Sequence, residues 1–100
     1  MSHQTNMDYL VMIAEEDVRT LNEKDKDYGS SWKRRGGVGA FMMLARKWDR
    51  LEQQVQLVGY DIFEAVTNDI RDEGLIDDLR DLRRYLLLVE SELVFRGTVK

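Results

Sequence analysis

The sequence predicts an all-α protein: a small helical bundle of three long helices plus one short helix, assembled into an oligomer. Apolar residues recur at three- and four-residue steps over most of the chain, as they do along one face of a helix. The 100 residues contain no proline, which suits long uninterrupted helices, and no cysteine, which removes disulfides and zinc-thiolate sites. The last quarter carries a leucine seam of heptad type, the pattern of helix–helix packing.

Apolar spacing predicts two long helices in the first half of the chain. The first covers residues 6–21, with an apolar face made by Met7, Leu10, Ala14, Val18 and Leu21. Residues 30–37 are expected to form a loop. The second helix covers residues 38–58 and ends at Gly59. Its apolar face is made by Phe41, Leu44, Ala45, Trp48, Leu51 and Val55, which places Trp48 in the core.

The second half predicts a short helix and a third long one. Asp61 can cap a helix over residues 62–70, which is followed by a break at residues 72–74. The last helix carries the seam Leu75, Leu79, Leu82, Leu86, Val89 and Leu93. Leu87, Leu88 and Val94 lie off this seam and form a second apolar face. Because so small a domain has little core left to cover that face, we expect a homodimer or homotetramer.

Composition limits the kind of protein and its partners. Residues 1–100 are expected to form one domain, since 43% are apolar and 34% charged. The net charge of −4 argues against binding to long nucleic acids, which requires a dominant basic face. The N-terminus does not resemble a signal peptide, and no apolar run reaches the ~20 residues that span a bilayer. We therefore expect a cytoplasmic protein without a membrane partner.

The segment KDKDYGSSWKRRGGVG, residues 24–39, carries the strongest functional signal. Lys33, Arg34 and Arg35 precede glycines at the start of a helix, and cations beside free backbone N–H groups are typical of phosphate sites. Lys47 can face the same cleft. Tyr28 and Trp32 can stack on a base, or simply anchor the loop. Alternatively, Lys33, Arg34 and Arg35 are simply consecutive surface charges in contact with solvent.

Carboxylates at helical spacing predict a Mg²⁺ site, because two acidic residues three apart can share an ion. The chain offers Asp49 with Glu52, and Asp78 with Asp81, between which Tyr85 lies around the helix. Glu52 and Asp78 are close to their helices' core directions, where an unpaired charge is costly. The alternative is chance spacing in a chain with 19 acidic residues, in which Asp81 bridges to Arg84 and Glu52 to a cation on a neighbouring helix.

Three segments resemble MazG-like nucleoside triphosphate pyrophosphohydrolases, in particular small phage proteins of nucleotide modification. They are KDKDYGSSWKRRGGVGAF, RKWDRLE and DDLRDLRRYLLL. The resemblance implies a nucleotide-binding helical bundle that uses Mg²⁺ to split a (d)NTP into monophosphate and pyrophosphate. It also implies that Asp78 and Asp81 match the family's E-x-x-D pair. Asp49, Glu52, Asp78 and Asp81 would be the metal ligands, with Glu52, Asp78 and Asp81 catalytic.

The chain departs from that family in its other acidic motif. An E-E-x-x-E pattern is intact nowhere: the first helix reads EEDVR at residues 15–19 and the second reads DRLE at residues 49–52. Two alternatives therefore stay open beside the hydrolase. One is a protein that binds or sequesters a nucleotide signal without turnover, and the other is a helical protein–protein adaptor.

Overall fold

The computed structural model describes residues 4–99, without the side chains of residues 27 and 28. That part of the chain is helical and contains no strand, which confirms the all-α class. None of its helices is long and apolar enough to cross a membrane. The chain divides into two units, one ending at Ser31 and the other starting at Trp32. A single domain over residues 1–100 stays a prediction.

The first unit consists of one long helix, α1 (Asn6–Tyr28). It begins with a capping box, in which Thr5 Oγ1 accepts from the Asp8 N–H at 3.3 Å and Asp8 Oδ2 accepts from the Thr5 N–H at 2.9 Å. The helix runs seven residues past the predicted end at Leu21, because no glycine interrupts it before Gly29. Most of its apolar stripe is exposed, including Met7, Leu10 and Val18.

The second unit holds the remaining helices, and its ends partly match the predicted ones. After a 3₁₀ turn (Ser31–Lys33), helix α2 (Gly36–Val55) starts two residues earlier than predicted and continues into a second 3₁₀ turn (Gln56–Val58). Gly59 closes that turn in the left-handed region, as predicted. Helix α3 (Ile62–Thr67) is shorter than predicted, and α4 (Leu75–Phe95) contains the whole predicted seam and ends two residues after Leu93. Asp61 caps α3 as predicted, since its Oδ1 accepts from the N–H groups of Phe63 and Glu64.

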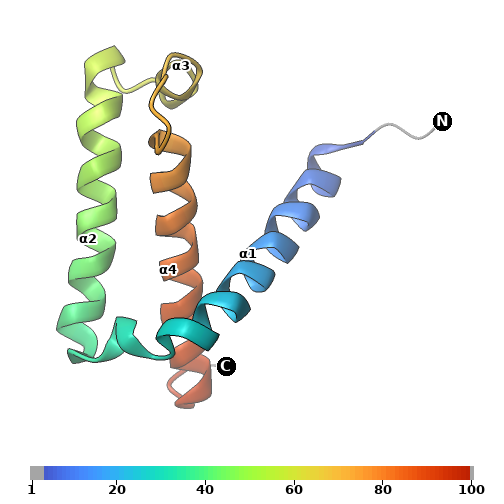
Figure 1. The fold of residues 1–100 in the computed structure, drawn as a ribbon, viewed down its shortest axis with the longest axis vertical. Coiled ribbons are helices and arrows are strands. Elements are labelled where there is room, and N and C mark those ends of the chain that lie inside the picture. The colour runs from blue at the N-terminus through green and yellow to red at the C-terminus, as the bar shows by residue number, and fades with distance from the viewer. Residues whose placement is uncertain (1–3, 100) are drawn as a thin grey trace. The chain divides into compact units, whose positions relative to one another are not determined.

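Helices α2 and α4 lie side by side and antiparallel, with α3 beside the end where they are connected (Figure 1). Only three apolar side chains of the described residues are buried: Leu51, Ala65 and Leu75. They are packed against partly buried neighbours, namely Val55, Val58, Val66, Leu79 and Leu82. The hairpin of α2 and α4 is therefore one layer of helices with a small core at its α3 end.

Trp48 does not belong to this core, contrary to the prediction. Its side chain is 56% exposed, and Phe41 on the same stripe is 66% exposed. Three residues separate Trp48 from Leu51, so Trp48 points about 60° around the helix from the buried direction. In the second unit no further layer of helices covers that side of the hairpin.

Asp69 organises the segment between α3 and α4. Its carboxylate accepts from the Leu75 N–H at 2.5 Å, from the Arg71 N–H at 3.1 Å and from two Arg71 guanidinium nitrogens at 2.9 and 3.0 Å. A Cβ on Gly74 would lie 2.5 Å from Asp69 Oδ2, so this close approach requires glycine. The Arg71 side chain, followed by the Leu75 and Arg71 N–H groups, holds the pKa of Asp69 well below its usual range. Asp69 thus serves as a cap for the start of α4.

We expect Asp69→Asn to lower the melting temperature by about 5 °C near neutral pH, because an amide loses the charge and one acceptor of this cap. A depressed folded-state pKa contributes stability above the unfolded pKa, and this contribution is lost as pH falls toward the folded pKa. The difference between wild type and variant should therefore shrink below about pH 4 in circular-dichroism melts. Asp72→Asn is the matched control in the same segment, and an equal loss there would contradict the assignment.

Candidate functional site

The start of α2 gathers free backbone donors and cations. Arg35 is the N-cap residue, and its side chain makes no capping hydrogen bond. The first intrahelical bond runs from the Gly39 N–H to the Arg35 oxygen, which leaves the N–H groups of Gly36, Gly37 and Val38 without a helical partner. The positive end of the helix dipole adds to the charge of the preceding residues. We call Lys33, Arg34, Arg35 and this helix start the basic end.

One carboxylate from α4 faces the basic end. Glu92 accepts from Lys33 Nζ at 2.6 Å and from Arg96 Nε at 2.7 Å. The Arg96 and Lys33 hydrogen bonds lower the pKa of Glu92, so it stays ionised at neutral pH. Lys33 is therefore already paired. Arg34 and Arg35 are exposed, and neither makes an ion pair within the described part of the chain.

Of the two aromatic residues predicted to contact a base, only Trp32 has a described side chain. Trp32 lies in the 3₁₀ turn directly before the basic end and is half-buried, which suits an anchor of this turn. Tyr28 is the last residue of α1, and its side chain lies outside the described residues. Stacking on a base stays a prediction for both.

The acidic pair of α4 is matched to a basic pair of α2. Asp78 Oδ1 lies 3.0 Å from Arg50 Nε, and Asp81 Oδ2 lies 3.1 Å from Lys47 Nζ. The Asp78 residue is only 3% exposed, and its Oδ2 has no hydrogen-bond partner among the described residues. The charge of Asp78 also helps to raise the pKa of Arg71, after the stronger effects of Asp69. Asp78 is thus a buried carboxylate that is held by cations and has one unpaired oxygen.

The remaining predicted metal ligands do not join this pair. Asp49 and Glu52 are both exposed, and the side chain of neither makes a hydrogen bond or ion pair with a described residue. Glu52 follows Arg50 by two residues, or about 200° around α2, so it projects from the side opposite the Arg50–Asp78 contact. Tyr85 is half-buried and lies one turn after Asp81 on the same side of α4. Lys47, which was predicted to contact a phosphate, is bonded to the carboxylate of Asp81.

These positions can be compared with what Mg²⁺ needs. Among the side chains that the structure describes, no three or more His, Asp or Glu residues are grouped so as to hold a metal ion. Both carboxylates of the α4 pair already face a cation at ion-pair distance. The described residues of one chain therefore do not fit a complete Mg²⁺ site.

Sequence reasoning missed two partners of the site residues. The sequence did not identify Arg50 as the partner of Asp78, nor Glu92 as the partner of Lys33. Glu92 is 59 residues from Lys33 in the sequence, so no local pattern could have joined them. Comparison of the chain with protein-family models, with curated proteins and with solved structures gave no match. The resemblance to MazG-like enzymes thus rests on the sequence motifs alone.

Proposed function

We propose that this protein binds a nucleotide or a related phosphorylated ligand at the basic end. The observation that carries the proposal is the pair of exposed arginines, Arg34 and Arg35, next to the uncapped start of a 20-residue helix. Guanidinium groups form forked hydrogen bonds with phosphate oxygens, and unpaired helix N–H groups donate hydrogen bonds to the same kind of oxygens. Trp32 would lie near the base.

The local charge supports an anionic ligand even though the whole chain is acidic. In the second unit the basic end and Arg96 contribute four cations, and Glu92 is the carboxylate bonded to two of them. A positive cluster of this kind attracts an anion despite a net charge of −4 over the chain. Lys33, which is tied to Glu92, has the smaller role in the proposal.

The test is titration calorimetry with a panel of nucleotides and with inorganic triphosphate, with and without Mg²⁺. We expect Arg34→Glu/Arg35→Glu to weaken binding at least about tenfold, because each charge-assisted hydrogen bond contributes about 1.5–3 kcal/mol. Arg46→Glu/Arg80→Glu changes the net charge equally on exposed helix positions and should leave affinity within about twofold. If both double variants lost affinity equally, the effect would come from the net charge and not from a site at the basic end. If no compound of the panel bound, the protein–protein adaptor would be favoured.

Hydrolysis of a (d)NTP to monophosphate and pyrophosphate is the second candidate. The favouring observation is Asp78, whose buried Oδ2 lacks a partner among the described residues and which sits one turn from Asp81. An orphaned buried carboxylate oxygen calls for an ion, a water or a ligand. Since one chain offers no complete Mg²⁺ site in its described part, further ligands would have to come from a second chain or from the triphosphate. Pyrophosphate release that is abolished by EDTA and by Asp78→Asn, but retained in Asp77→Asn, would establish the enzyme.

A further inference from the structure

Large apolar side chains are exposed where α2 turns into α3 and where α3 ends. Four of them are each more than two-thirds exposed: Leu57, Tyr60, Phe63 and Ile70. The turn is tight, since the Tyr60 N–H donates to the Val55 oxygen at 2.8 Å. Helix α3 has six residues and is therefore only about 9 Å long. The side chains before, on and after α3 thus come from one small region of the second unit.

Two of these side chains do not serve the fold of the second unit. Tyr60 has a positive φ of 68°, a conformation that is unfavourable for a bulky side chain and easy for glycine or asparagine. Phe63 lies two residues before the buried Ala65, about 200° around α3, so it points away from the core. Residues held in unfavourable backbone conformations cluster at binding sites. Contact with something outside the second unit is therefore the role that remains for the Tyr60 ring.

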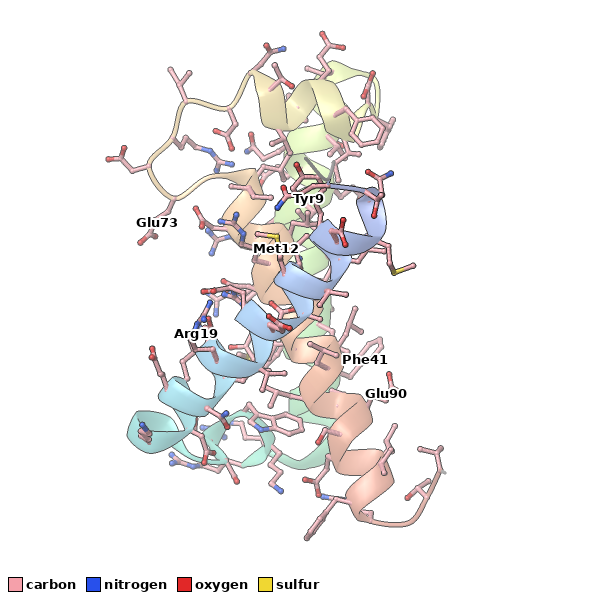
Figure 2. All side chains as sticks on the ribbon, turned by 90° about the vertical axis from the view of Figure 1, so that its right-hand side faces the viewer. Tyr9, Met12, Arg19, Phe41, Glu73 and Glu90 are labelled. Atoms are coloured by element: carbon pink, nitrogen blue, oxygen red, sulfur yellow. The ribbon has the colours of Figure 1, made fainter. Side chains whose placement is uncertain are left out.

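Carboxylates surround these apolar side chains. Residues 57–77 contain six acidic residues and one arginine, Arg71, which is paired with Asp69. Three of the carboxylates are exposed and make no ion pair with a described residue, namely Glu64, Asp72 and Glu73. Figure 2 shows Glu73 on the connection between α3 and α4, pointing away from the helices. We call the four exposed apolar residues and these three carboxylates the acidic end.

Helix α1 does not supply cations that match the acidic end. Helix α2 is about 30 Å long, so only the first half of α1 is far enough along the chain from the start of α2 to reach its other end. Residues 4–18 contain four carboxylates and no lysine or arginine. Their approach to the acidic end would bring like charges together.

We infer that the acidic end is a docking surface for a segment of another protein that is both basic and apolar, such as an amphipathic helix with lysines beside leucines. Aromatic side chains are the usual anchors of protein interfaces, and charges around them select the partner. Tyr60 and Phe63 are the anchors here, and the three unpaired carboxylates select a basic partner. The same carboxylates disfavour an anionic membrane surface. The basic end lies at the opposite end of α2, so the two surfaces are separate.

The test is fluorescence anisotropy of the full chain with a labelled peptide of about 15 residues that carries leucine and lysine at helical spacing. A second peptide, with serine in place of leucine, has the same charge and should bind at least about tenfold more weakly. Tyr60→Asn/Phe63→Ser should weaken binding of the leucine peptide at least about tenfold. Asparagine adopts the left-handed conformation readily, so this variant should keep its fold, which circular dichroism checks.

Phe95→Ser is the matched control for the apolar anchors. Phe95 is 84% exposed and Phe63 is 85% exposed, but Phe95 lies at the other end of the hairpin. Its replacement should leave affinity for the leucine peptide within about twofold. The carboxylates are tested with Glu73→Lys, which should weaken binding at least about threefold. Glu90→Lys makes the same charge change at an exposed position of α4 and should have the smaller effect.

Three results would overturn the inference. They are no binding of the leucine peptide by wild type, equal binding of the two peptides, and equal losses in the Phe63 and Phe95 variants. Light scattering adds a fourth: a wild-type dimer that dissociates in Tyr60→Asn/Phe63→Ser would assign the surface to a second copy of this chain. Nucleotide binding at the basic end is measured separately, so failure of one proposal leaves the other to its own test.

Discussion

Leu75→Ala is expected to destabilise the protein by about 2–5 kcal/mol, the cost of deleting a fully buried leucine side chain. Leu75 is 1% exposed and is the most buried of the three core side chains in the described residues. It begins α4 directly after the Asp69 cap, so its packing fixes where α4 starts against α2 and α3. Small domains are stable by only about 5–15 kcal/mol, and the small core here favours the lower end.

Urea unfolding followed by circular dichroism measures this effect. Leu86→Ala makes the same truncation on the same helix at a side chain that is 50% exposed. Truncating a leucine that points only to solvent costs well under 1 kcal/mol. Because Leu86 is half-exposed, Leu86→Ala should cost less than Leu75→Ala. Equal losses at the two positions would show that the core does not lie where the described structure places it. Both variants should be compared at one protein concentration, because any self-association would add to the apparent stability.

Arg50→Met is expected to cost about 3 kcal/mol, because it leaves the buried carboxylate of Asp78 without its closest cation. The Asp78 side chain is 5% exposed whereas that of Arg50 is 44% exposed, so the two partners are not equivalent. Loss of the carboxylate leaves an arginine that can reach water. Loss of the arginine leaves a charged carboxylate that cannot reach water. We therefore expect Asp78→Leu to cost less than Arg50→Met.

The double variant Arg50→Met/Asp78→Leu separates pairing from simple packing. Replacing both partners with apolar side chains of similar size is often neutral, so the double variant should regain most of the stability lost in Arg50→Met. Additive losses would instead mean that Arg50 acts through its aliphatic stem and that Asp78 is not its partner. Arg80→Met, at a weak surface pair 3.9 Å from Asp77, should change the unfolding free energy by less than about 0.5 kcal/mol.

Helix positions were predictable wherever local chemistry decides them. The cap by Asp61 and the turn at Gly59 depend on residues within a few positions, and both occur as expected. The seam of α4 indicated the right helix, but periodicity alone does not tell how much of a seam one chain can cover. Leu75 is buried, whereas Leu86 is 50% exposed, because the core lies at the α3 end of the hairpin.

The candidate site was less predictable, since its contacts join residues far apart in sequence. Spacing grouped Asp78 with Asp81 correctly on one side of α4, yet it could not show that Arg50 and Lys47 face them. Angles measured on each helix separately placed Glu52 and Asp78 near a core. They did not reveal that the two residues lie on opposite sides of the helix pair, because that depends on which way α2 is turned toward α4.

Glu92 gives the protein a shared electrostatic element. It bonds to Lys33 before α2 and to Arg96 after α4, so the entry and the exit of the hairpin depend on one negative charge. Coupling of this kind is reciprocal: the Lys33 bond changes the free energy of the Arg96 bond by the same amount as the Arg96 bond changes that of the Lys33 bond. An anion that draws Lys33 away would leave Glu92 to Arg96 alone. Binding of the proposed anion at the basic end would therefore be thermodynamically linked to order in the last turn of α4.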